Sequence, residues 1–111
     1  MSYNSANLSL LAQAAGPIGC KLWVYDSVEV TTDFDIAGYI SDAKERGMEK
    51  GDMVLHRIWT TAAPTTTAEK QTAAGTANIL TDAGWHIVMG ISTAGAADLA
   101  NETAITVTNS D

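Results

Sequence analysis

Large apolar and smaller or polar side chains alternate along several short stretches of this chain, as they do in half-buried β-strands. The clearest case is 85–91, where every second residue from Trp85 onward is large and apolar. In 21–25 both faces of the predicted strand are apolar. The other stretches with strand patterns are 53–59, 103–108 and, more weakly, 8–11. We therefore expect a mainly β fold, a small antiparallel β-barrel or sandwich with at most one short helix.

One segment between the second and third predicted strands favours a helix. Ser41 is a suitable N-cap, Lys44 to Arg46 supply a basic last turn, and Gly47 is a typical helix stop. Gly38 just upstream limits any longer helix. Gly51 and Asp52 then predict a turn into the strand that begins at Met53.

A tract at 61–77 differs in composition from the rest of the chain. Twelve of its 17 residues are Thr or Ala. Its Thr-rich, Pro-containing start disfavours helix, although 68–74 could form a short one. We consider a flexible linker, a loop, or an extended arm ordered by a neighbouring subunit, and favour a loop or arm on a single domain that spans 1–111.

The composition limits how much core the chain can build. Of its 51 apolar residues, 18 are Ala, which removes little surface from water when it is buried. Leu, Ile, Val and Phe together number 22, close to the level of ~20% below which folding alone becomes doubtful. We expect contacts between copies of the chain to supply part of the missing burial.

The charge and the N-terminus argue against several classes of partner. The net charge is −7, and the only basic cluster, Lys44 to Lys50, is neutralised by Glu45 and Glu49. Proteins that bind DNA or RNA need clustered basic residues, so we expect no direct contact with nucleic acid. We see no secretory signal and no membrane span. The single Cys20 suits folding in a reducing cytoplasm.

Candidate metal-binding and catalytic residues are few. His56 and His86 each lie in a predicted strand and could meet, but zinc needs three or four ligands, and no spacing in the sequence supplies them. Buried or interfacial histidines are the simpler interpretation. Asp33 and Asp35 form a close acidic pair that a surface loop with local turns explains better than a glycosidase or calcium site.

No arrangement typical of nucleophilic catalysis or nucleotide binding is present either. Residues 90–94 resemble a nucleophile elbow only superficially, since the last position is Ala94 and not Gly. Cys20 has Lys21 beside it, yet nothing marks a base partner. We expect a protein that is not an enzyme and uses no cofactor and no metal.

The tryptophans are the residues most suited to binding. Trp23, Trp59 and Trp85 can simply form the core of a lean domain. If both faces of their strands are covered, however, Trp23 and Trp59 can anchor an interface with another subunit. A platform for sugars is a third possibility.

Several short motifs resemble a known group of proteins. "LWxY", "GY", "GM" and "GD-x-V" follow one another at the intervals found in small proteins encoded among the structural genes of tailed bacteriophages, and 90–99 is similar to their C-terminal half. The stretches of this chain that carry the motifs are Lys21–Ser27, Gly38–Ala43 and Arg46–Val54. The resemblance covers about two-thirds of the chain and leaves the 61–77 tract unmatched.

The resemblance implies a virion protein that is made in the host cytoplasm. We expect a capsid decoration or cement protein, or the base of a head fibre or tail appendage, with no cofactor. Its partners would be itself, as a homotrimer, and the major capsid protein or another virion protein. The alternatives are a receptor- or carbohydrate-binding module and a small hydrolase that uses His56 or His86. The expected contact residues are Trp23, Tyr25, Trp59, Thr65, Thr66 and Thr67.

Overall fold

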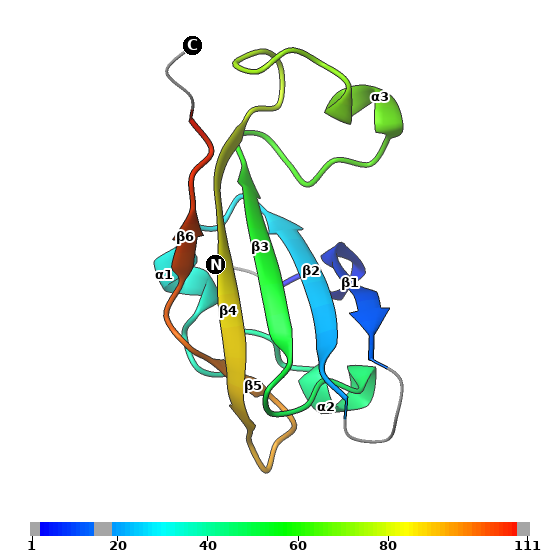
Figure 1. Cartoon of the computed structure of the whole chain (residues 1–111), viewed down its shortest axis with the longest axis vertical. Helices are drawn as coiled ribbons and strands as arrows, with labels where there is room; N and C mark the ends of the chain where they lie inside the picture. The colour runs from blue at the N-terminus through cyan, green and yellow to red at the C-terminus, as the bar shows by residue number, and fades with distance from the viewer. Residues whose placement is uncertain (1–2, 15–18, 109–111) are drawn as a thin grey trace.

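A computed structural model of the chain, which describes residues 3–14 and 19–108, contains one six-stranded mixed sheet (Figure 1). The strand order is β1-β2-β3-β4-β5, and β6 also pairs with β4. The strands are β1 (Leu8–Gln13), β2 (Lys21–Ser27), β3 (Met53–Trp59), β4 (Leu80–Ile91), β5 (Ala97–Leu99) and β6 (Thr103–Ile105). The mainly β class expected from the sequence is confirmed.

The sheet is neither a closed barrel nor wholly antiparallel. β2 and β3 pair in parallel, from Leu22 opposite Met53 to Ser27 opposite Ile58, while the other pairs are antiparallel. A parallel pair cannot be joined by a tight turn and needs a crossover connection. Residues 28–52 form this crossover, and in Figure 1 they pass behind the sheet.

The crossover carries two of the three short α-helices found within residues 3–14 and 19–108, so the expected limit of one helix was too low. These are α1 (Thr31–Phe34) and α2 (Ala43–Arg46). The predicted stop of α2 is confirmed, because Gly47 adopts the left-handed conformation at φ 90° and its N–H bonds the carbonyls of Ala43 and Lys44. A 3₁₀ turn at Ser5–Asn7 precedes β1.

The crossover covers one face of the sheet and forms the core there. Trp23, Tyr25 and Val54 from the strands are buried against Phe34 and Ile40 from the crossover. Tyr25 stacks on Phe34, with ring centroids 5.2 Å apart. This buried side holds the hydrophobic core cluster of the described residues.

The Thr/Ala-rich tract connects β3 to β4 and contains the third helix, α3 (Thr67–Lys70). Thr66 caps this helix by accepting the N–H of Glu69, as in a capping box. In Figure 1 the tract projects beyond the end of the sheet. We call residues 60–79 the arm. No helix within the described residues is long and apolar enough to cross a membrane.

Candidate interaction face

The face of the sheet that points away from the crossover is also apolar. Residues that alternate with the buried ones along β2, β3 and β4 point to it, so the strand register places them side by side. We call these residues the open face: Leu22, Val24, Asp26, Met53, Leu55, Arg57, Ala83, Trp85, Ile87 and Met89.

Within the open face, exposure is highest along β4. Ile87 is 47% exposed and Met89 is 57% exposed, although both are large apolar side chains. Val24, Leu55 and Trp85 lie in neighbouring strands at the middle of the face and are half-buried by one another. A contiguous exposed apolar patch on a soluble protein marks an interaction surface more often than scattered single residues do.

The two charged residues of the open face neutralise each other. Asp26 on β2 and Arg57 on β3 are register partners, and the guanidinium donates two hydrogen bonds of 2.7 and 2.8 Å to the carboxylate. The indole N–H of Trp59 donates to the same carboxylate at 2.9 Å, and the Arg57 guanidinium lies 5.6 Å from the Trp59 ring. The ion pair therefore places polar groups in fixed positions on the open face without giving it a net charge.

The arm lies beside one end of this face. Together with Trp59, Val107 and Thr108 it lines an open cavity of about 490 Å³. Asn78 closes the base of the arm, because its side-chain oxygen accepts the backbone N–H of Thr61 at 2.8 Å. The cavity has threonine and alanine walls and the carboxylate of Glu69, which is occupied by hydrogen bonds from Thr65 and Thr66. These hydrogen bonds, first that of Thr65, lower the pKa of Glu69.

The aromatic residues expected at an interface lie largely in the core. Trp23 and Tyr25 are buried on the covered face, which is the alternative that the sequence left open for the tryptophans. Trp59 is 8% exposed at the foot of the arm. Thr65, Thr66 and Thr67 are exposed on the arm. The structure thus does not bring the six expected contact residues together, and their role in contacts stays a prediction.

The two histidines meet in the core, as considered from the sequence. Their ring centroids lie 6.2 Å apart, and Phe34 stacks on His56 at 4.0 Å. His56 is fully buried, and its Nε2 lies 2.7 Å from the Ser27 hydroxyl while its Nδ1 has no hydrogen-bond partner. Burial, and secondarily His86, lowers the pKa of His56 to about 3. The neutral imidazole therefore prevails, packed as an aromatic core residue.

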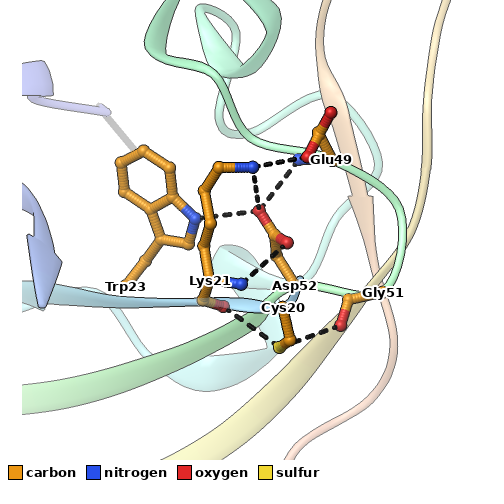
Figure 2. A network of polar contacts seen from close by, with 6 residues as sticks. All are labelled: Cys20, Lys21, Trp23, Glu49, Gly51 and Asp52. Carbon is orange, nitrogen blue, oxygen red and sulfur yellow. Dashed lines mark hydrogen bonds and ion pairs between the residues drawn. The ribbon is translucent and has the colours of Figure 1, made fainter. Parts of the chain in front are cut away.

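Asp52 lies at the centre of a polar cluster (Figure 2). Its buried carboxylate accepts the indole N–H of Trp23 at 3.1 Å and the backbone N–H groups of Lys21 and Glu49 at 3.2 and 3.0 Å. The Lys21 ammonium bonds Glu49, which raises the pKa of Lys21. The nearby thiol of Cys20 donates weakly to backbone carbonyls, at 3.4 Å to that of Lys21. This cluster fixes the entry into β3.

The other candidates do not converge on a site. Asp33 lies in α1, and Asp35 directly follows it. Within the described residues, no three His, Cys, Asp or Glu side chains are grouped so that they could hold a metal ion. The open face is therefore the feature of the structure with the clearest functional meaning.

The open face could be predicted only in part from the sequence. The alternation identified which residues share a face, for example Trp85, Ile87 and Met89, but it did not indicate which of two apolar faces the rest of the chain would cover. The signal that could have indicated an interface was the presence of two apolar faces in one lean domain. No protein-family model, curated protein or solved structure matches the chain.

Proposed function

We propose that this protein is a structural subunit of a larger particle and acts by binding other protein surfaces. The observation that carries the proposal is the open face, a continuous apolar sheet surface around Val24, Leu55 and Ile87. Burying such a surface is favourable by roughly 25 cal/mol per Å². A protein that presents it in solution gains stability from association.

The resemblance to structural proteins of tailed phages makes the proposal more specific. The subunit would be a capsid decoration or cement protein that binds the major capsid protein as an oligomer, with a homotrimer as the expected state. The arm supports this role, because it projects beyond the end of the sheet and carries the exposed Thr65, Thr66 and Thr67. The acidic net charge of −7 favours docking on a basic surface.

Particles of the encoding phage that are assembled without this gene provide the test. We expect the purified protein to co-sediment with them at saturable sites and to raise the temperature at which they release DNA. Deletion of the gene should lower that temperature correspondingly. Particles of unchanged stability that bind none of the protein would overturn the proposal. Saturable binding of a glycan under the same conditions would instead favour a carbohydrate-binding module.

A further inference from the structure

We infer that the open face is the surface through which copies of this chain bind one another. The inference rests on the proposed function and deepens it, because it assigns this surface to a sister subunit and leaves the arm and the acidic remainder for other virion proteins. The supporting observations are the missing second layer, the distribution of charge and the amount of exposed surface.

A sheet with two apolar faces needs a layer on each. Stable domains bury every apolar sheet face against another element. The crossover supplies one layer with Phe34, Ile40 and Met48. Ala83 is buried, but Ile87 and Met89 are exposed and the large apolar residues of β2 and β3 are only partly buried, so the described part of the chain supplies no complete second layer over them. A second copy, turned face to face, provides a layer of matching size, as in a two-sheet sandwich. Such a contact joins copies in pairs, so a homotrimer needs a second, different contact between copies.

The charge distribution suits a sister copy. The chain carries 13 acidic and 6 basic residues, so two copies repel each other at most surfaces. Among the open-face residues the charged ones are Asp26 and Arg57, which pair within one chain. The exposed Asp98 of β5, opposite Gly90, lies at the border of the face. Two such faces can therefore meet with little like-charge repulsion and without leaving an unpaired buried charge. A basic partner would gain little electrostatic attraction at the open face and more on the acidic remainder of the surface.

The amount of exposed surface agrees with an interface of ordinary size. The chain exposes 6576 Å², whereas a compact monomer of its mass of 11.6 kDa exposes ~5,800 Å². The difference of about 700 Å² is close to the ~800 Å² that each partner buries in a standard interface. The excess belongs to the whole chain, and the projecting arm contributes to it; Ile87 and Met89 are its exposed large apolar side chains on the open face.

A matched pair of substitutions tests the inference. Ile87 on the open face and Ile36 on the crossover are 47% and 46% exposed, so a glutamate at either position is solvated in a single chain. We expect light scattering over a dilution series to give twice 11.6 kDa, or a higher even multiple of it, for the unaltered protein and for Ile36→Glu. Ile87→Glu should dissociate to monomers, with a dissociation constant raised at least about 100-fold and unchanged circular dichroism.

Met89→Glu, at a position that is 57% exposed, provides an independent second variant if Ile87→Glu fails to fold. An unaltered protein that is monomeric at every concentration overturns the inference, as does an oligomer that neither open-face variant weakens.

The particle-binding assay separates this inference from the proposed function. If the monomeric protein binds particles and Ile87→Glu abolishes that binding, the open face meets another virion protein, and only the inference fails. If Ile87→Glu dissociates the oligomer but the unaltered oligomer never binds particles, the inference stands and the proposed function fails.

Discussion

Asp52 is the residue on which the start of β3 depends. Its carboxylate accepts three N–H groups, from Trp23, Lys21 and Glu49, inside a buried site (Figure 2). These donors come from β2 and from the end of the crossover, so one side chain joins the two segments. A carboxylate suits this place because it only accepts hydrogen bonds, while an amide presents its own N–H groups to the same donors.

Asp52→Asn should therefore destabilise the fold by about 2–3 kcal/mol, because hydrogen bonds to a charged acceptor are lost and buried donors remain unpaired. Urea denaturation followed by tryptophan fluorescence measures this difference. Asp98→Asn makes the same chemical change on an exposed residue of β5 and should alter the free energy of unfolding by less than about 0.5 kcal/mol. Equal effects of the two substitutions would show that Asp52 is not an anchor.

His56 makes the stability of the core depend on pH. Its pKa is about 3 in the folded protein and 6.5 in an unfolded chain, so the unfolded chain binds the proton more readily. The neighbouring His86 opposes protonation, and Asp26 favours it weakly. Stability is therefore fully present above pH 6.5 and is lost as the pH falls from 6.5 toward 3.

Between pH 7.5 and pH 5 we expect this residue to remove about 2 kcal/mol from the free energy of unfolding. Denaturant titrations at both pH values should show the loss in the unaltered protein. His56→Leu keeps the position apolar, and Ser27 retains the backbone N–H of Glu29 as a partner. This variant should lose correspondingly less stability over the same interval. A parallel decline in both proteins would contradict the assignment.

At the scale of elements, β4 depends on a glycine where β6 joins the sheet. Gly84 pairs with His56 of β3 on one side and with Ala104 of β6 on the other. The Glu102 side chain lies over Gly84, and a Cβ added there would come within 2.1–2.3 Å of three of its atoms. The missing side chain therefore leaves room for the segment that leads into β6.

Gly84→Ala should destabilise the protein by about 1–3 kcal/mol through overpacking. Gly90→Ala, on the same strand, meets only Lys50 at 4.0 Å and should leave stability unchanged or slightly raised. Thermal unfolding compares the two. In a Glu102→Ala background the cost of Gly84→Ala should largely disappear, and a cost that persists there would exclude Glu102 as its cause.

Much of the element structure could be predicted from the sequence, and the exceptions have physical reasons. β3 was predicted at its observed limits, Met53–Trp59, because a run of large, mostly apolar residues follows the Gly51–Asp52 turn. β5 was missed because Ala97–Leu99 is too short to show a pattern. The parallel pairing was missed because alternation is a property of one strand and not of its partner. The open face could be identified only from the structure, which shows which face of the sheet the crossover covers.

At the scale of the whole molecule, charge and apolar surface are separated. The net charge is −7, yet the open face holds one neutralised ion pair. Association through this face must therefore overcome repulsion between the acidic remainders of the copies. Dissolved salt screens such repulsion over ~10 Å at 0.1 M.

Association between copies should consequently strengthen as salt is added. We expect the dissociation constant to fall several-fold between about 50 and about 500 mM NaCl, measured by sedimentation equilibrium at constant pH. Sodium sulfate, which strengthens the burial of apolar surface, should lower it further. Weaker association at high salt would instead mean that ion pairs between chains hold the oligomer together.

The parallel pairing of β2 and β3 sets the order of events in folding and assembly. No hairpin can bring Val24 beside Leu55, because residues 28–52 must first close into the crossover. Such pairing forms slowly, because the long connection must close, at a cost in entropy, before the two strands make any contact. The middle of the open face therefore forms only after the crossover has packed and the core is in place. Incompletely folded chains would lack the surface that we propose sister subunits bind, so under this proposal folding itself controls which molecules associate.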